Sequence, residues 1–473
     1  MRHTGNQVFW RAARRVGIFL IGIELAAALI IPGLSWGAFS GTATPSSGMT
    51  VSDATMPAPS GVSGTLTASS VVTFSGAQFL NGISCPSTTE CWAVGVGSSG
   101  GGVAVEWING TWDTPQTIPN TSTSTMLGIS CPSTTYCMAV GLVAGPTSIC
   151  PGYGGCGIYT TWTQQAGWNS PSTVTDVYNL SSVSCPSTTE CWAVGYWENT
   201  AVSTNGYGVA VNINQGSVDV INGTVGLNDI SCPSTTECWA TGNATNGGGT
   251  YYDIVSEWIN GAWTAPETLV NDTDESLYVS CPVTTYCMAV VAGAVFEWTQ
   301  GSWTQSPSVP ITSLSISCPS SSVCWVAGDF GSSGEVAEWT ASGGWGTAQS
   351  ISGTTELRGI SCPSTSLCWA VGEDSSNVGV AYDPIPSLSL TWTPPTNTSD
   401  ADGNPLVASQ QVVEAPYNGS TCGTSWTPVT SGLGASATSA TVSSPSSSEC
   451  YSVEAVNQSG SWTKIASTEV APG

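Results

Sequence analysis

A motif with two closely spaced cysteines recurs along the chain and constrains its fold more than any other feature. The first copy is Ile83-Ser-Cys-Pro-Ser-Thr-Thr-Glu-Cys-Trp-Ala-Val-Gly95, and successive first cysteines are 37 to 54 residues apart. The first cysteines of the seven copies are Cys85, Cys131, Cys185, Cys232, Cys281, Cys318 and Cys362. Repeats of this length are typical of propellers, solenoids and arrays.

Each repeat predicts four short strands. In the first repeat one strand ends at Cys85, a polar turn follows, and a second strand begins at Cys91. The segment Val103–Ile108 predicts a third strand, and Asn109-Gly110 predicts a tight hairpin turn into a fourth. A helical pattern is absent. Four strands in each of seven repeats predict an all-β fold, a seven-bladed β-propeller.

The hairpin turn also predicts which aromatic residues face each other. Across the first turn, Trp107 is expected opposite Trp112. The same arrangement is expected for Trp258 with Trp263 and for Trp298 with Trp303. Such pairs could stack on sugars. Their recurrence at one position favours a structural role, in which they pack blade on blade.

The two ends of the repeat region predict a closed ring. The seventh repeat stops after its third strand, Gly379–Tyr382. The segment Gly64–Phe74 precedes the first repeat and aligns with a fourth strand. We therefore expect this N-terminal strand to complete the seventh blade of a propeller over 64–385, which removes exposed sheet edges.

The repeated Ser-Cys-Pro-Ser sequence, followed by Cys and Ala-Val-Gly, resembles a group of secreted actinobacterial propeller-like repeat proteins. The resemblance covers about 64–385. It implies the fold and export from the cell, and it implies no activity.

The remaining residues, 386–473, predict a C-terminal β-sandwich. The segments Leu388–Pro395 and Tyr451–Gly460 resemble those of a fibronectin type III domain. Trp392 would be its core tryptophan, and Tyr451, Val453 and Ala455 would point inward. The family's usual aromatic residue is replaced by polar residues at Ser409–Gln411. Such domains usually act as spacers or adhesion modules.

The N-terminal 1–43 predicts a secretory signal peptide. Arg2, Arg11, Arg14 and Arg15 precede an apolar run over Val16–Ile31, and small residues follow it. An uncleaved N-terminal anchor is the alternative, because Val16–Ser40 is long enough to span a bilayer. A linker over 44–63 would then lead into the propeller.

The chain contains 18 cysteines, and all of them follow the signal segment. Their regular pairing predicts disulfides and an oxidising compartment, so we expect the protein to be secreted or held at the cell surface. The predicted pairs are Cys85–Cys91, Cys131–Cys137, Cys150–Cys156, Cys185–Cys191, Cys232–Cys238, Cys281–Cys287, Cys318–Cys324, Cys362–Cys368 and Cys422–Cys450.

The charge balance limits the partners. The formal net charge is −25, and only Arg358 and Lys464 are basic beyond the signal segment. Nucleic acids and anionic membrane surfaces are therefore not expected as partners, and membrane attachment would require an uncleaved N-terminal segment. An acidic habitat is a further hypothesis, because most carboxylates are neutral near pH 3. The sequence predicts no particular oligomeric state.

The side chains available for chemistry are few. The single histidine, His3, lies in the signal segment, so no catalytic triad, metal site or cofactor is predicted. Acid–base chemistry by loop carboxylates is the remaining enzymatic alternative. The candidates are Glu198, Asp253, Asp329, Glu373 and Asp374. Four glutamates recur before a tryptophan and are expected to be structural: Glu106, Glu257, Glu297 and Glu338.

The loops favour a binding role. The loops between second and third strands vary in length. These loops and the blade-to-blade linkers lie at the same end of the blades, and we call this end the variable face. The longest loops carry aromatic residues outside the repeated positions: Tyr153, Trp197, Tyr207, Tyr251 and Tyr252.

We predict an extracellular or cell-surface binding or adhesion protein that recognises a glycan or a protein there, without catalysis. A carboxylate-dependent carbohydrate-active enzyme and a purely structural envelope protein are the alternatives. The same loops could also be neutral insertions.

Overall fold

The computed structural model describes 58–67, 70–145, 155–197, 206–245, 250–271, 277–291, 293–299, 301–309, 311–396, 406–417, 421–443, 449–457 and 463–465. All regular secondary structure within these ranges is β-strand. They include no helix with the length and apolar character needed to span a bilayer. The predicted signal segment 1–43 and most of the predicted linker lie outside them.

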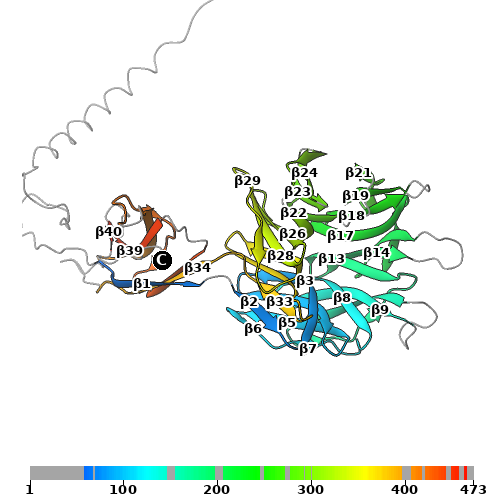
Figure 1. Ribbon diagram of the computed structural model, residues 1–473, viewed down its shortest axis with the longest axis horizontal. Coiled ribbons are helices and arrows are strands. Elements are labelled where there is room, and N and C mark those ends of the chain that lie inside the picture. Colours follow the sequence, from blue (N-terminus) through cyan, green and yellow to red (C-terminus); the bar gives the residue numbers. More distant parts are fainter. Residues whose placement is uncertain are drawn as a thin grey trace, which may run out of the picture. The chain divides into compact units, whose positions relative to one another are not determined.

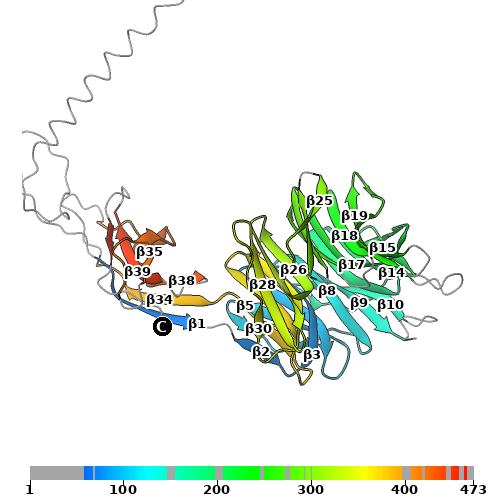
Figure 2. The same ribbon diagram turned by 45° about the horizontal axis from the view of Figure 1, so that its top comes forward.

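The chain divides into two compact units, a larger one over Leu66–Leu388 and a smaller one with most of the remaining residues. Within the described residues, the larger unit contains seven antiparallel sheets of four or five strands. The sheets follow one another in chain order (Figure 1 and Figure 2). This is a β-propeller arrangement, with each sheet corresponding to one sequence repeat.

The first strands are β3 (Ala77–Ser87), β8 (Ser124–Ser133), β13 (Asn179–Ser187), β17 (Thr224–Ser234), β22 (Tyr278–Val283), β26 (Thr312–Ser320) and β31 (Glu356–Ser364). The second strands are β4 (Glu90–Gly97), β9 (Tyr136–Ala144), β14 (Glu190–Trp197), β18 (Glu237–Thr245), β23 (Tyr286–Val291), β27 (Val323–Phe330) and β32 (Leu367–Glu373).

The third strands are β5 (Gly102–Ile108), β10 (Gly155–Thr163), β15 (Tyr207–Asn212), β19 (Tyr251–Ile259), β24 (Ala294–Thr299), β28 (Ser333–Thr340) and β33 (Gly379–Tyr382). The outer strands are β6 (Thr111–Trp112) with β7 (Gln116–Thr117), β11 (Gly167–Trp168) with β12 (Ser172–Thr173), β16 (Ser217–Val220), β20 (Ala262–Trp263) with β21 (Glu267–Asn271), β25 (Ser302–Ser306), β29 (Gly344–Trp345) with β30 (Gln349–Ile351), and β2 (Val71–Phe74).

The seventh sheet takes its outer strand from the N-terminal side of the repeats. In that sheet β2 pairs with β33, from Val71 opposite Tyr382 to Phe74 opposite Gly379. The strand is shorter than the expected Gly64–Phe74, because β33 has only four residues with which to pair. Ser60–Thr67 instead forms β1, which pairs with β34 (Ser387–Thr393) of the smaller unit. The expected linker over 44–63 therefore includes the start of a strand.

The disulfides within the repeats join the first strand of each sheet to the second. Each closes a sequence separation of six residues, with Cα atoms 4.0 to 4.1 Å apart. These are the pairings expected from the spacing of the motif. Cys156 is also disulfide-bonded. Its expected partner, Cys150, lies outside the described residues.

The glycine of the Ala-Val-Gly sequence is required by a close approach between strands. The first strand carries a bulge here, for example between Leu80 and Gly82. A Cβ atom on Gly95 would collide with the carbonyl oxygen of Phe79. The equivalent glycines Gly141, Gly195, Gly242 and Gly372 would meet backbone oxygens in the same way. The repeated glycine is therefore explained by packing.

Neighbouring sheets are joined by a repeated hydrogen bond. In each repeat a serine directly precedes the first cysteine. The Oγ of this serine accepts a hydrogen bond from the backbone N–H of the first cysteine of the next sheet, at 2.9 to 3.0 Å. The series includes Cys85, which donates to Ser361 of the seventh sheet at 3.0 Å. The first strands contact each other in the same order, and β31 also contacts β3.

Tryptophans fill the space between sheets. Trp107 pairs with Trp112 in the predicted register. A hairpin pair of this kind packs on the second-strand tryptophan of the preceding sheet, with ring centroids 4.6 to 5.7 Å apart. The sets are Trp92 with Trp162 and Trp168, Trp192 with Trp258 and Trp263, Trp239 with Trp298 and Trp303, and Trp369 with Trp107 and Trp112.

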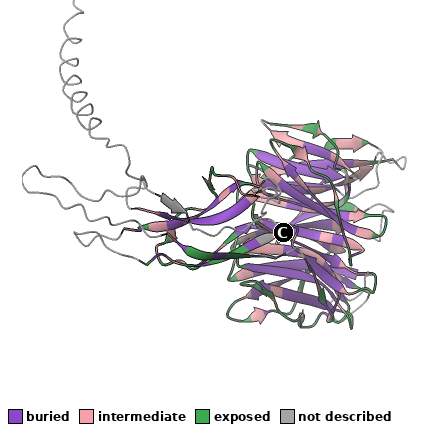
Figure 3. Ribbon diagram, turned by 60° about the vertical axis from the view of Figure 1, so that its left-hand side comes forward, coloured by how far each residue is buried: buried purple, intermediate pink, exposed green. Residues whose placement is uncertain are grey.

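The smaller unit has two sheets. One is ordered β1–β34–β38 (Ser439–Ser443). The other is ordered β36 (Thr427–Pro428), β35 (Ser409–Pro416), β39 (Glu449–Val456) and β40 (Thr463–Ile465), with β37 (Leu433–Gly434) also on β35. Cys422 and Cys450 form a disulfide. Within each unit, buried residues run along the strands and exposed residues lie mainly at the turns (Figure 3).

The polar residues at the centre of this unit have a structural explanation. The Nε1 of the buried Trp392 donates to Oε1 of Gln410 at 2.8 Å. The Nε2 of Gln410 donates to the backbone carbonyls of Gly434, Ala435 and Ala437. Gln410 is fully buried. It thus satisfies buried donors and acceptors at the place where the resemblance predicts an aromatic residue.

Candidate functional site

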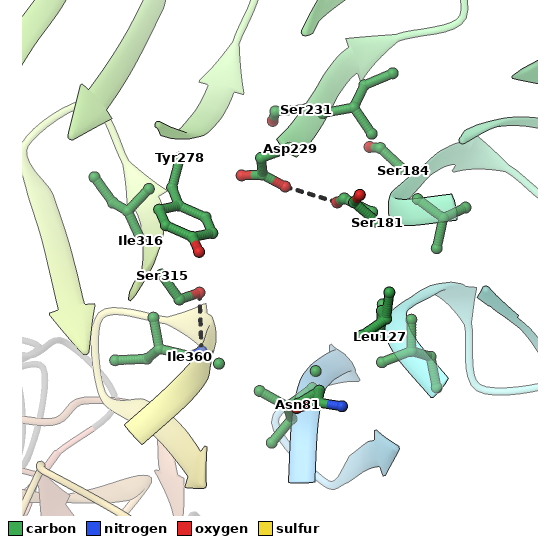
Figure 4. Close-up of a pocket in the computed structure, with 18 of the residues that line it drawn as sticks. Asn81, Leu127, Ser181, Ser184, Asp229, Ser231, Tyr278, Ser315, Ile316 and Ile360 are labelled. Atoms are coloured by element: carbon green, nitrogen blue, oxygen red, sulfur yellow. Dashed lines mark hydrogen bonds between the residues drawn. The ribbon is translucent and has the colours of Figure 1, made fainter. Parts of the chain in front are cut away.

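A polar pocket lies where the seven first strands meet. Its volume is about 300 Å³, and every one of those strands contributes residues to its wall. Figure 4 shows side chains from several of the sheets pointing into it, among them Tyr278, Asp229, Ser181 and Asn81. Liquid water occupies about 30 Å³ per molecule, so the pocket could hold about ten waters or one side chain.

The wall of the pocket contains most of the positions at which the repeats differ. Each first strand has an aliphatic residue and a serine immediately before its cysteine, and the two positions before those vary. The residues four positions before the cysteine are Asn81, Leu127, Ser181, Asn228, Leu277, Leu314 and Arg358. The residues three positions before it are Gly82, Gly128, Ser182, Asp229, Tyr278, Ser315 and Gly359.

Asp229 is held by neighbours on three sheets. Ser182 of the third sheet donates its hydroxyl to Oδ1 at 2.6 Å, and the N–H of Val279 in the fifth sheet donates to Oδ2 at 2.9 Å. The N–H of Ile230 is a further donor. Burial raises the pKa of Asp229 above its ordinary value, and these three hydrogen bonds act in the opposite direction.

The pocket wall differs from one side to the other. On the side of the seventh, first and second sheets, the third position before the cysteine is glycine. A Cβ atom on Gly359 would lie 2.9 Å from the carbonyl oxygen of Asn81, so these first strands approach too closely for a side chain. Elsewhere a polar side chain spans the gap: the Oγ of Ser315 accepts from the N–H of Ile360 at 3.2 Å. At this position, therefore, side chains line the pocket only from the third to the sixth sheets.

Arg358 is the one cation in the pocket wall, and its guanidinium is already engaged. Its Nη2 lies 2.7 Å from a carboxylate oxygen of Glu356 and 2.9 Å from one of Glu373. Its Nη1 donates to Asn81 at 3.3 Å, and its Cζ lies 4.7 Å from the ring centroid of Phe79. Arg358 thus connects the seventh sheet to the first, and its buried Nε has no hydrogen-bond partner in the described structure.

The predicted aromatic residues do not form one cluster in the described structure. Trp197 and Tyr207 face each other across β14 and β15, with ring centroids 5.8 Å apart. Tyr251 is exposed at the start of β19, whereas its neighbour Tyr252 packs against the core between the third and fourth sheets. Tyr153 lies outside the described residues. Tyr207 and Tyr251 are exposed, whereas Trp197 is half-buried and packs against the core between the second and third sheets.

The loop carboxylates have structural partners in most cases. Asp253 is fully buried and accepts from Nδ2 of Asn243 at 2.9 Å. Glu373 pairs with Arg358, and Asp374 accepts two backbone N–H groups of its own turn. Asp329 is half-buried in β27.

Glu198 lies outside the described residues. In the described part of the chain, no group of three or more Cys, Asp or Glu residues is placed to hold a metal ion.

The repeated residues of the motif do not predict the pocket, although the sequence contains a signal for it. The signal is the pair of variable positions that precedes each copy of the motif. Their variation within an otherwise repeated strand distinguishes them. Three residues before the first cysteine, for example, the first repeat has Gly82, whereas the fourth has Asp229 and the fifth has Tyr278.

Comparisons with known proteins give structural similarity only. No protein-family model matches the chain, and no curated protein matches its sequence. Three solved structures share its general arrangement. YCF48 bound to D1 peptide is 13% identical, with 69% of this chain and 97% of that chain covered at a TM-score of 0.44.

The WD40 β-propeller domain of Doa1 is 11% identical, and the match covers 68% of this chain and 97% of that chain at a TM-score of 0.47. U3-55K is 11% identical, and the match covers 66% of this chain and 98% of that chain at a TM-score of 0.46. These values are too low to transfer a function to this chain.

Proposed function

We propose that the larger unit is a closed propeller of seven blades. Three features support closure: β2 supplies the outer strand of the seventh sheet, Cys85 donates a hydrogen bond to Ser361, and Trp112 packs on Trp369. The hydrogen bond and the tryptophan contact are the same kinds of contact that join consecutive repeats elsewhere in the chain. A closed ring fixes the first strands against one another and so gives the pocket at their centre a rigid wall.

This propeller acts as a non-catalytic binding protein outside the cell. The observation that carries the proposal is the concentration of variable residues in the pocket wall, on strands that otherwise repeat. Variation placed on a rigid scaffold is the usual arrangement of a recognition site. The residues of the pocket wall precede the first cysteine in each first strand, toward the end at which the blade-to-blade linker enters. The ligand therefore enters from the variable face, where Tyr207 and Tyr251 are exposed.

The other parts of the chain fit this role. The disulfides indicate an oxidising compartment, which supports export by a signal peptide at 1–43. The smaller unit serves as a spacer of the fibronectin type III kind, since its buried core tryptophan and the Cys422–Cys450 disulfide give it a core of its own. A protein ligand is favoured over a glycan, because the strongest contacts that the pocket offers are charged and hydrogen-bonding groups rather than flat aromatic surfaces.

A retention assay tests this function. The full chain without 1–43 is passed over immobilised extracellular protein and, separately, over immobilised cell-wall polysaccharide, and release of reducing sugar is followed. We expect retention on protein without turnover. The double variant Tyr207→Ala, Tyr251→Ala, which truncates two exposed side chains, should reduce retention and leave the melting temperature unchanged. Turnover of polysaccharide, or no retention on either material, would contradict the proposal.

A further inference from the structure

The pocket has one carboxylate whose described hydrogen-bond partners are all neutral. Asp229 accepts from a serine hydroxyl and from two backbone N–H groups. Arg358, the one basic residue of the pocket wall, is bound by Glu356 and Glu373 instead. A carboxylate deep in a protein is normally balanced by a positive charge. Asp229 therefore has no cationic partner among the described residues of the pocket wall.

This carboxylate is open to an incoming group. Asp229 is only half-buried, although it lies deep among the first strands, because part of its surface faces the pocket. Figure 4 shows its side chain at the edge of the open space, with Tyr278 and Ser181 also directed into that space. A carboxylate has about four lone-pair positions, and three hydrogen bonds leave one available.

The surroundings of Asp229 suit an organic cation. The ring of Tyr278 can face a cation, and the hydroxyl oxygens of Ser181 and Ser315 can accept its N–H groups. Glu356 and Glu373 both contact Arg358, so the positive charge of this one basic residue of the pocket wall is balanced. The whole chain also favours a cation, since its formal net charge is −25.

We propose that the pocket binds the cationic side chain of a partner protein, an arginine or a lysine, with Asp229 as its counter-charge. This inference rests on the proposed binding function and adds the chemistry of the ligand. A protein side chain is favoured over a free amine, because a protein could also contact the exposed Tyr207 and Tyr251 of the variable face. The acidic chain would also attract a basic partner.

The test uses a charged probe and its neutral isostere. N-acetyl-arginine amide and N-acetyl-citrulline amide are titrated by calorimetry into the full chain without 1–43. We expect the arginine probe to bind in the millimolar range or tighter, and the citrulline probe to bind at least about tenfold more weakly. Added salt should weaken binding of the arginine probe only.

Variants locate the site. Asp229→Asn should weaken binding of the arginine probe at least about tenfold, whereas Asp219→Asn, a carboxylate on β16 outside the pocket wall, should leave it unchanged. If Asp229→Asn does not fold, Tyr278→Ala is measured instead, and the same loss is expected. Equal binding of both probes, displacement by glucose, or no binding of the arginine probe would overturn the inference.

The outcome separates this inference from the proposed function. If the full chain is retained on immobilised extracellular protein and Asp229→Asn is retained equally well, the cationic ligand is wrong and the binding function stands. If the unaltered chain is not retained at all, the binding function itself fails.

Discussion

Trp112 in β6 packs edge-to-face on Trp369 in β32, with ring centroids 5.1 Å apart. The two residues belong to the first and the seventh repeat. Trp107 lies beside them, 5.7 Å from Trp369. Neighbouring repeats elsewhere are joined by the same kind of contact, as where Trp298 and Trp303 pack on Trp239. The chain thus uses one interface both between consecutive repeats and between its first and last repeat.

The ionisable groups predict that acidification stabilises the protein. Burial raises the pKa of Glu106 to about 6, with help from Glu90 and Asp113, and burial raises the pKa of Asp383 to about 7. A carboxyl group with a higher pKa in the folded state binds protons more tightly when folded. The free energy of unfolding should therefore rise as the pH falls from above 7 to about 4.5, near the pKa of unfolded carboxyl groups.

Calorimetry can measure this effect. The melting temperature at pH 5 should exceed that at pH 7 by at least about 3 °C. The variant Glu106→Gln should show a smaller increase, because its side chain cannot become charged. A melting temperature that falls steadily from pH 7 to pH 5 would contradict the assignment, and loss of the folded state by pH 3 would count against an acidic habitat.

The disulfides predict two different losses of stability. Replacing Cys185 and Cys191 with serine opens a loop with a sequence separation of 6 and should cost the larger unit about 2 kcal/mol. Replacing Cys422 and Cys450 opens one with a separation of 28 and should cost the smaller unit about 3.5 kcal/mol. Denaturant unfolding measures both values, and peptide mapping that finds bridges between repeats would refute the pairing.

The seventh sheet predicts a strong effect of Phe74. This residue of β2 is buried and packs on Trp112 with ring centroids 5.4 Å apart. Phe74→Ala should therefore destabilise the larger unit by about 3 to 5 kcal/mol, as expected for a core phenylalanine. The control is Val62→Ala in β1, which should leave the unfolding of the larger unit unchanged. If Phe74→Ala costs less than about 1 kcal/mol, β2 contributes little to the sheet.

Much of the propeller architecture could be predicted from local patterns. The two-residue turn at Asn109-Gly110 specifies the register of Trp107 and Trp112, and both residues of the turn have positive φ. The spacing of six residues between Cys85 and Cys91 fits a hairpin between two strands. Such features depend on residues close together in the chain, so the sequence alone contains them.

The features that the sequence did not predict depend on distant residues. The pairing of β1 (Ser60–Thr67) with β34 joins residues more than 300 positions apart in the chain, and the short β2 reflects the short length of β33. The pocket depends on all seven first strands at once. Asp229 is the clearest example, because its role becomes visible only when Ser182 and Val279 are placed beside it.

A double-mutant cycle on Trp112 and Trp369 tests the central claim that the first and last repeats are neighbours in a closed ring. Unfolding free energies are measured for Trp112→Ala, Trp369→Ala and the double variant, with Trp112→Ala and Trp239→Ala as the control pair. If the ring is closed, the coupling free energy between Trp112 and Trp369 should be about 0.5 to 1.5 kcal/mol. The coupling free energy of the control pair should lie within about 0.5 kcal/mol of zero. Equal, near-zero coupling in both cycles would contradict the closed ring and the binding pocket that depends on it.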